Sequence, residues 1–396
     1  MRTTIIIPTY NEADNIENCI NTVKKVLVES NLINSFNFLV TDANSSDGTA
    51  NIVKTLIAKD SNIHLIEEGS KQGIGKAYSN AMKKAFSDLQ SDAVITFDAD
   101  LSHDPKVIPE MVKLLEDGAD YVCGTRYRKG GGIPSNWGIH RKLLSIVGNM
   151  FIRVLYFQAG LSDFTSGFKA FKKNVFEKIS DKISQHKGYT FSISTNIEAY
   201  RAGFKIHEVP YMFKDRTKGE SKMGAEYLIM GFKFVTLSWI SDMLKVRIVR
   251  VLLAGGVGAV FQLISYGLIF YPLFEDKNIL NLNITSQFIG FSIAPRFLIS
   301  QLFAIEVGVL STFLVNNYWT FKDHVLHGTK LIYGFLKNNV GVSIAILIQL
   351  WVGQILEYLF GEGIVRHYTY QVVGILVGLV WNFYFYKKIV WKIKSK

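Results

Sequence analysis

Two aspartates, Asp98 and Asp100, are the residues of this sequence best suited to bind a metal ion. They follow the apolar run Ala93–Phe97, which predicts a strand, and residues two apart in a strand point to the same side. A divalent cation relieves the repulsion between two such carboxylates, and Mg²⁺ or Mn²⁺ held in this way completes its shell with phosphate oxygens. An Asp-x-Asp pair is also common in surface turns. Its position after a strand and before residues 101–105 (Leu-Ser-His-Asp-Pro) favours the metal site.

Basic side chains form a second group that could bind a phosphate, because arginine offers a planar fork with two parallel donors. Three positions stand out: Arg126 after the predicted strand Tyr121–Gly124, Arg141 with Ser145 one helical turn beyond it, and Arg216 in the run 213–222. Each position by itself is equally compatible with an ordinary solvated surface. Convergence on one phosphate is therefore a hypothesis that the spacing does not prove.

The elements that would position these residues alternate between strands and helices. Predicted strands are Thr3–Ile7, Phe36–Val40, Ile63–Ile66 and Ala93–Phe97, and predicted helices are Asn15–Ser30, Thr49–Asp60 and Ile74–Asp88. Such alternation predicts a Rossmann-like α/β fold with a mainly parallel sheet and ligands at the carboxyl ends of the strands. Polar segments follow three of the strands, at 9–12, 42–49 and 98–100. No Gly-x-Gly-x-x-Gly follows the first strand, which disfavours a dinucleotide site.

The sequence changes character from about Val246, where apolar stretches long enough to cross a membrane begin. Four are expected, roughly Val251–Phe270, Phe297–Trp319, Val340–Phe360 and Tyr370–Tyr386, against a need for about 20 residues each. Basic residues gather before the first, between the second and third, and after the fourth. The positive-inside rule then puts both termini in the cytoplasm. The first apolar run, ended by Pro8, is too short for a signal peptide, which agrees.

The basic excess of the chain, a formal net charge of +11 over 396 residues, largely brackets these apolar stretches. That placement favours lipid headgroups over nucleic acid as the partner. Segment 226–245 is rich in apolar and aromatic residues and predicts a helix lying at the membrane surface. Cys19 and Cys123 lack a metal-binding or redox spacing and are expected to be reduced core residues.

One acidic residue, Glu306, lies inside the second apolar stretch, where an unpaired charge costs at least about 2.5 kcal/mol. A packing carboxyl that is protonated or hydrogen-bonded to Asn316 or Asn317 is the favoured interpretation. Contact with a lipid headgroup is the alternative.

The N-terminal half resembles a family 2 glycosyltransferase of the GT-A fold, and specifically the dolichyl- or polyprenyl-phosphate mannose synthases. The motifs that carry the resemblance occur in the family's order: Ile-Pro-Thr-Tyr-Asn-Glu (7–12), Asp-Ala-Asn-Ser-Ser-Asp-Gly-Thr (42–49), Asp-Ala-Asp-Leu-Ser-His-Asp-Pro (98–105), Gly-Thr-Arg-Tyr (124–127), Arg-Lys-Leu (141–143), Asp-Phe-Thr-Ser-Gly-Phe (163–168), Glu-Val-Pro (208–210) and Gly-Glu-Ser-Lys (219–222). The C-terminal half is similar to a GtrA-like membrane domain, through Glu306 and 317–321 (Asn-Tyr-Trp-Thr-Phe). The implied domains are a cytoplasmic GT-A domain over 1–225, an interfacial amphipathic linker helix over 226–246 and an all-α, four-span transmembrane domain over 247–396.

The resemblance implies a donor site for GDP-mannose. Residues that would contact the donor nucleotide are Pro8, Tyr10, Glu12, Asp42, Asp98 and Ala99. Residues that would lie at the Mg²⁺ or Mn²⁺ ion are Asp98, Asp100 and Ser102. Three positions depart from the family pattern: Ala43 replaces a frequent acidic residue, Ser102 a frequent glutamine, and Ser194 an expected glutamate for which Glu198 is a possible substitute.

The resemblance also implies an acceptor site for a dolichyl or polyprenyl phosphate in the membrane lipid. Residues that would bind the acceptor phosphate are Arg126, Arg141, Ser145, Arg216 and Lys222. The residues expected to be catalytic are Asp100, Arg126, Arg141 and Arg216. A phosphate monoester, with a second pKa near ~6, is already an anion and needs no general base. Arginines would neutralise it while the metal stabilises the departing nucleoside diphosphate, so direct displacement would invert the anomeric carbon.

Three alternatives remain at this point. The donor could be UDP-glucose or another nucleotide-sugar, since base and sugar preference are poorly encoded. A processive polysaccharide synthase also joins a GT-A domain to membrane spans, but the QxxRW-like motif usual there is absent. A non-enzymatic lipid-binding or lipid-translocating membrane protein is the alternative of another class.

Overall fold

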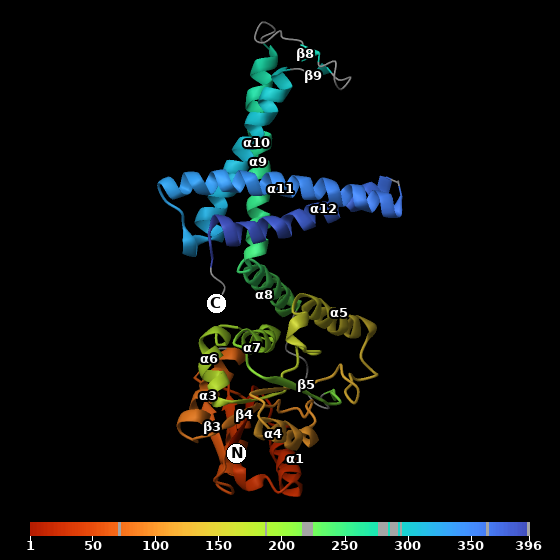
Figure 1. The fold of residues 1–396 in the computed structure, drawn as a ribbon. Coiled ribbons are helices and arrows are strands. Elements are labelled where there is room, and N and C mark those ends of the chain that lie inside the picture. The colour runs from red at the N-terminus through yellow and green to blue at the C-terminus, as the bar shows by residue number, and fades with distance from the viewer. Residues whose placement is uncertain are drawn as a thin grey trace. The chain divides into compact units, whose positions relative to one another are not determined.

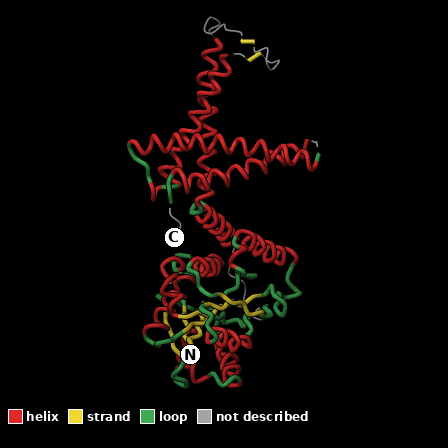
Figure 2. Tube along the Cα trace, in the orientation of Figure 1, coloured by secondary structure: helices red, strands yellow, loops and turns green. Residues whose placement is uncertain are grey.

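The computed structural model describes residues 1–69, 73–186, 188–215, 225–275, 284–285, 292–293, 295–361 and 364–393. They form two compact units, Met1–Trp239 and Ile240–Lys396 (Figure 1). The first unit combines strands with helices, whereas the second is almost entirely helical (Figure 2). The change from an α/β half to a helical half that the composition predicts is therefore confirmed.

A seven-stranded sheet forms the centre of the first unit, in the order β3-β2-β1-β4-β6-β5-β7. Its strands are β1 (Thr3–Thr9), β2 (Phe36–Asp42), β3 (Ile63–Glu67), β4 (Ala93–Thr96), β5 (Tyr121–Thr125), β6 (Lys169–Lys172) and β7 (Ile206–Pro210). Every neighbouring pair is parallel except those of β6, which runs antiparallel to both β4 and β5. The mainly parallel sheet is confirmed, with one reversed strand that the sequence pattern does not reveal.

Helices cover both faces of this sheet because alternate strand residues point to opposite sides. Ile5 and Ile7 of β1 belong to the core of one face, and Ile6 belongs to the core of the other. The first face carries α1 (Ile16–Glu29), α2 (Thr49–Ile57) and α4 (Ile108–Glu116), and the second carries α3 (Ile74–Ser87), α6 (Lys173–Ile183) and α7 (Tyr189–Arg201). Cys19 and Cys123 are buried free thiols, one in each core, as expected.

Two further helices of the first unit, α5 (Ile139–Leu155) and α8 (Ala225–Met243), contact each other through stacked Phe151 and Phe232 rings 4.8 Å apart. Val235 of α8 is buried in the second core, and Ser238 accepts a hydrogen bond from Arg201 of α7. The segment expected to be a linker helix is thus helical, and Phe232, Val235 and Ser238 attach it to the rest of the first unit. Its position at a membrane surface stays a prediction. Short 3₁₀ helices complete the connections: η1 (Ile33–Ser35), η2 (Pro105–Val107), η3 (Phe157–Ala159) and, in the second unit, η5 (Lys322–His324).

The second unit consists of two helical hairpins (Figure 1). In the first hairpin α9 (Arg247–Glu275) lies beside α10 (Pro295–Val315), with the short strands β8 (Ile284–Thr285) and β9 (Ser292–Ile293) between them in sequence. In the second, α11 (Thr329–Phe360) lies beside α12 (Ile364–Phe385). Both hairpins end in a π-helical turn, η4 (Asn316–Thr320) and η6 (Tyr386–Val390).

Three helical segments of the described residues are long and apolar enough to cross a membrane: Arg247–Leu268, Thr329–Gln349 and Val373–Val390. They correspond to the first, third and fourth predicted spans. The second, Phe297–Trp319, coincides with α10 and η4 but is not among these three segments. The count of four spans therefore stays a prediction.

Trp391, which follows the second hairpin, is fixed against the end of the first. Its indole stacks on Phe321 with ring centroids 4.3 Å apart, and its Nε1–H donates to Oδ1 of Asn317 at 3.1 Å. The Asn317 amide also bonds to the backbone of Leu326 in both directions. No hydrogen bond between Glu306 and either Asn316 or Asn317 is present in the described part of the chain, so that form of its favoured interpretation is wrong.

Close packing of α3 gives a test of the fold. A methyl group at Gly75 would lie 2.1 Å from the backbone oxygen of His186, so one of the two segments must move. We expect Gly75→Ala to lower the free energy of unfolding by about 1–3 kcal/mol. Gly148→Ala in α5 meets nothing within 4 Å and should instead raise it by about 0.5–1 kcal/mol. Denaturation of the full chain in detergent measures both, and equal effects would contradict the packing.

Candidate active site

The carboxyl ends of β1 and β2 form one wall of the site. Asp42, the last residue of β2, is 1% exposed and accepts hydrogen bonds from Thr9 Oγ1 at 2.9 Å and from both the backbone N–H and the hydroxyl of Ser45. These three donors fix the orientation of the carboxylate. A carboxylate has about four acceptor sites, so one is left for a ligand.

The two loops that follow these strands are tied together. The Asn11 N–H donates to the Ser45 hydroxyl at 2.8 Å, and the Ser46 N–H donates back to Asn11 Oδ1 at 3.0 Å. Asn11 adopts a left-handed backbone with φ of 55°, a conformation that asparagine tolerates better than most residues. The next residue, Glu12, is anchored through its N–H to Thr49 Oγ1. Pro8, Tyr10, Glu12 and Asp42, all expected at the donor nucleotide, are thereby brought to one edge of the sheet.

Asp98 and Asp100 follow β4 at the same edge, but not in the way that strand alternation predicts. The strand ends at Thr96, so both aspartates lie in the turn beyond it and their directions are set by that turn. Leu101 takes a left-handed φ of 57°, and the Ser102 N–H donates to Asp100 Oδ1 at 3.0 Å. The expectation that both face one place by strand geometry is wrong, because the ladder with β6 has already ended.

The two charges nevertheless act on the same neighbours. Burial, followed by the charges of Asp98 and Asp100, raises the pKa of the buried Cys19 thiol and of the Tyr78 hydroxyl. Hard carboxylate oxygens concentrated in this way suit Mg²⁺ or Mn²⁺. Across the described residues, no group of three or more His, Cys, Asp or Glu side chains is arranged to hold a metal. Two carboxylates are the donor set with which Mg²⁺ is usually bound when substrate phosphates and water complete its shell.

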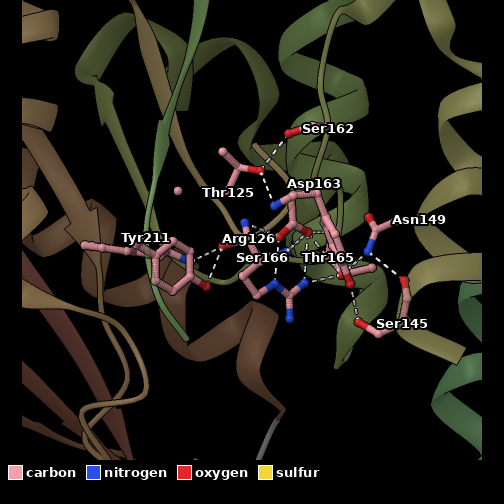
Figure 3. Close-up of polar contacts among 12 residues, drawn as sticks. Thr125, Arg126, Ser145, Asn149, Ser162, Asp163, Thr165, Ser166 and Tyr211 are labelled. Atoms are coloured by element: carbon pink, nitrogen blue, oxygen red, sulfur yellow. Dashed lines mark hydrogen bonds and ion pairs between the residues drawn. The ribbon is translucent and has the colours of Figure 1, made fainter. Parts of the chain in front are cut away.

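Arg126, directly after β5, is the most tightly held of the basic residues. Its Nε and Nη2 donate to the two oxygens of Asp163 at 2.7 and 2.9 Å, and Nη2 also reaches Thr165 (Figure 3). Burial alone would lower the pKa of Arg126 and raise that of Asp163. The ion pair reverses both effects, raising the arginine pKa and lowering the aspartate pKa.

The Nε and Nη2 atoms of Arg126, which could form the two parallel hydrogen bonds to a phosphate, are thus occupied by Asp163. Within the described residues, Nη1 of Arg126 makes no hydrogen bond and is the part of the guanidinium left for a ligand. Asp163 itself was not among the expected site residues. Its place in Asp-Phe-Thr-Ser was a usable signal, because an aspartate followed by Thr and Ser typically accepts backbone N–H groups two and three residues on. Those bonds, from Thr165 and Ser166, are present.

A hydrogen-bond network extends from this pair to α5 (Figure 3). Asn149 of α5 donates to Thr165 Oγ1 and to the backbone oxygen of Ser145, and accepts from the Phe164 N–H. The Ser145 hydroxyl lies 2.5 Å from that of Tyr127, the neighbour of Arg126. Ser145 and Arg126 therefore belong to one hydrogen-bond network, and their binding to a shared phosphate stays a prediction.

Arg141 is on the same helix, near its first turn. Its guanidinium lies 3.8 Å from the centre of the Trp137 ring, and Nη1 donates to Asp215 at 3.2 Å. Asp215 is the residue before Arg216 in the sequence. Arg216 and Lys222 themselves lie outside the described residues.

Much of the outer surface of α5 is apolar and exposed, with His140 and Arg153 as exposed polar residues among it. Its apolar residues are between 46% (Ile146) and 78% (Ile139) exposed, and they are Ile139, Leu143, Leu144, Ile146, Val147, Met150 and Val154. A helix on a water-soluble surface normally turns such residues inward. We call these seven residues the apolar face of α5, the helix that also carries Arg141 and Ser145.

Lys169, the first residue of β6, is a buried cation next to the site. It is 1% exposed, and its Nζ donates to the backbone oxygen of Ser192 at 2.9 Å. Burial lowers the pKa of Lys169 to about 8. Glu198, a possible substitute for the glutamate missing at Ser194, instead pairs with Lys182 and Arg201.

Each of the two units is similar to a known protein family or domain. Residues 4–180 match Glycosyl transferase family 2, and residues 250–391 match the GtrA/DPMS transmembrane domain. The chain is 33% identical to an undecaprenyl-phosphate mannosyltransferase of Micrococcus luteus, over 56% of this chain and 88% of that protein. It is 34% identical to a polyprenol monophosphomannose synthase of Mycolicibacterium smegmatis, over 56% and 81% of the two chains.

A third relative extends over both units. The dolichol-phosphate mannosyltransferase of Pyrococcus furiosus is 29% identical over 97% of this chain and 96% of its own. Together with the three apolar helices, the transmembrane-domain match makes this chain a membrane protein.

The Arg126–Asp163 pair can be tested through stability. Asp163→Asn keeps the shape of the side chain but leaves a buried guanidinium without its counter-charge. We expect the free energy of unfolding to fall by about 3–5 kcal/mol, as for other buried pairs deprived of one partner. Asp181→Asn, an exposed aspartate of α6, is the control and should change it by less than about 0.5 kcal/mol. Thermal unfolding of the full chain measures both, and a small effect of Asp163→Asn would refute the pairing.

Lys169 gives a prediction with a defined pH dependence. At pH 7 its burial penalises folding, so Lys169→Met should raise the free energy of unfolding by about 2–3 kcal/mol. Above pH 8 the folded protein loses this proton before the unfolded chain does, so the parent gains stability as the pH rises. The advantage of the variant should therefore shrink between about pH 8 and 10. Lys173→Met, which removes an exposed lysine, should show no such trend.

Proposed function

Because the chain belongs to glycosyl transferase family 2, we propose that it transfers mannose from GDP-mannose to a dolichyl or other polyprenyl phosphate. The names of its relatives support mannose as the sugar and a polyprenyl phosphate as the acceptor. The product would be a polyprenyl-phosphate-mannose for downstream glycosylation. GDP as the donor nucleotide and inversion at the anomeric carbon are our inferences from the chemistry.

The observation that carries the acceptor proposal is the make-up of α5. One helix combines Arg141 and Ser145, which could bind a phosphate, with an exposed apolar face of seven residues. A polyprenyl phosphate needs that combination, since its headgroup is an anion at the membrane surface and its chain is hydrocarbon. An amphipathic helix of this kind lies at the boundary between water and lipid. Arg216 and Lys222 would complete the phosphate site from the neighbouring segment.

The donor would lie at the carboxyl ends of β1, β2 and β4. Pro8, Tyr10, Glu12 and Asp42 would hold the nucleoside, and Asp98 and Ala99 would contact its phosphates. Asp98, Asp100 and Ser102 would hold Mg²⁺ or Mn²⁺, which when bound supplies positive charge to the leaving diphosphate. Asp100, Arg126, Arg141 and Arg216 are the proposed catalytic residues.

The role of the protein in the reaction is mainly electrostatic. The acceptor phosphate is already an anion near pH 7, so no side chain has to remove a proton from it. Nη1 of Arg126 and the guanidinium of Arg141 would offset its charge as it approaches the sugar, with the Asp163 pair keeping Arg126 in place. Attack from the face opposite the leaving group would invert the anomeric carbon without a covalent glycosyl-enzyme.

The membrane unit would anchor this chemistry to the lipid. In this proposal α10 supplies a fourth span, and α8 lies at the surface of the membrane as the linker between 1–225 and 247–396. Basic residues at the ends of α9, α11 and η6 support a cytoplasmic position for the catalytic unit and both termini.

Transfer of label from GDP-mannose to a polyprenyl phosphate in detergent tests the proposal. We expect an organic-extractable mannolipid that forms with Mg²⁺ or Mn²⁺ and not with EDTA. Asp100→Asn should reduce its formation by about 100-fold or more, because the ligand charge is lost. Asp104→Asn is the matched control from the same motif, since Asp104 caps η2 and should be dispensable. If product forms only from UDP-glucose, the proposed donor is wrong. If no donor gives product, the proposal that the protein is an enzyme is wrong.

The apolar face of α5 gives a second test. Val147→Ser combined with Met150→Gln should raise KM for a long-chain polyprenyl phosphate by about tenfold, since each buried methylene contributes about 0.8 kcal/mol. A short-chain acceptor phosphate should show little change. Equal effects on the two acceptors would argue against contact between this face and the lipid.

A further inference from the structure

A buried histidine, His103, contacts both the backbone and the side chain of Asp98. It is 1% exposed and lies in the turn after β4, five residues beyond Asp98. Its ring is stacked on Phe168, with centroids 4.9 Å apart and planes 8° from parallel, and meets the edges of Phe97 and Tyr211. Aromatic rings on three sides therefore fix the plane of the imidazole.

The two ring nitrogens of His103 both face the same residue. The backbone N–H of Asp98 donates to Nδ1 at 3.2 Å, and Nε2 lies 3.6 Å from the Asp98 carboxylate oxygen Oδ2. An N–H group can only donate, so Nδ1 must be an unprotonated acceptor. The neutral ring then carries its proton on Nε2, the nitrogen that faces the carboxylate.

This arrangement orients the Asp98 side chain as well as its backbone. A separation of 3.6 Å is too long for a hydrogen bond, but the Nε2–H dipole still attracts the carboxylate. Second-sphere donors of this kind typically set the orientation of carboxylates that bind a cation. None of the steps of the proposed reaction requires His103 to accept or lose a proton, so its burial beside Asp98 calls for another explanation.

We propose that His103 is a positioning residue, which holds the Asp98 carboxylate in place for the donor nucleotide and its divalent cation through the Nε2–H group. This inference rests on the proposed function. The stack on Phe168 makes the position of the His103 ring rigid, because Phe168 belongs to the same loop as Asp163. The Phe168 N–H donates to Ser166 Oγ, and the Ser166 N–H to Asp163.

Three substitutions separate the contributions of the ring. His103→Gln places an amide donor close to the position of Nε2, whereas the shorter His103→Asn reaches only the position of Nδ1. His103→Phe keeps the stack on Phe168 and removes both nitrogens. We expect the Asn and Phe variants to bind Mn²⁺ about 10- to 100-fold more weakly in the presence of GDP, and the Gln variant to lose less than about fivefold.

Binding is measured on the full chain in detergent, from the electron paramagnetic resonance of free Mn²⁺ with GDP present. Parent-like affinity in the Phe variant would assign His103 to packing alone and overturn the proposal, as would equal losses in the Gln and Asn variants. Thermal unfolding identifies any variant that fails to fold. If His103→Phe fails to fold, the comparison between His103→Gln and His103→Asn still decides the question.

Mannose transfer by the parent protein is assayed separately in the same preparation. If the parent makes no mannolipid but the Mn²⁺ series behaves as expected, the proposed function fails while the role of His103 stands. If the parent is active and the series fails, only the role of His103 is lost.

Discussion

The ion pair between Arg126 and Asp163 is the constraint on which the acceptor side of this molecule depends. A guanidinium buried after β5 needs a counter-charge, and Asp163 of the loop before β6 supplies it. The same carboxylate then accepts backbone N–H groups of that loop, and the loop is bonded to α5 through Asn149. One electrostatic requirement therefore determines the positions of β5, the 163–168 loop and the helix that carries Arg141 and Ser145.

The donor side is organised differently, by short polar links between loops that follow parallel strands. Asp42, Asn11 and their serine partners bind the ends of β1 and β2 together, while a ring of aromatic side chains around His103 supports Asp98. The first arrangement is made of hydrogen bonds that range from buried to exposed, and the second of packed rings. Two parts of the proposed donor site thus derive their rigidity from different forces, and a change in salt or pH would affect them unequally.

Much of this could be anticipated from the sequence, because the relevant signals are local. Apolar runs predicted the mainly parallel sheet and the helical membrane half, and the polar segments after them predicted which loops gather at one edge of the sheet. What could not be predicted depends on contacts between distant segments. Nothing in the residues around Lys169 indicates that β6 is reversed, and the pairing of Arg126 with Asp163 joins positions 37 residues apart. The turn that contains Asp98 and Asp100 was misjudged for the same reason, since β4 ends where its partner β6 begins.

Because β6 is reversed, one continuous stretch of the chain can change independently of the rest of the sheet. A parallel strand would have had to begin at the opposite edge of the sheet, whereas antiparallel β6 begins at the edge where β4 and β5 end, next to both strands. The stretch from Arg126 to Phe168 accordingly starts and finishes at neighbouring strands on one edge of the sheet. It is a cassette that contains α5 and both partners of the ion pair, and it contacts the proposed nucleotide side through Phe168, which stacks on His103. Exchange of this cassette between homologous enzymes is a direct route to altered acceptor preference with the sugar donor unchanged.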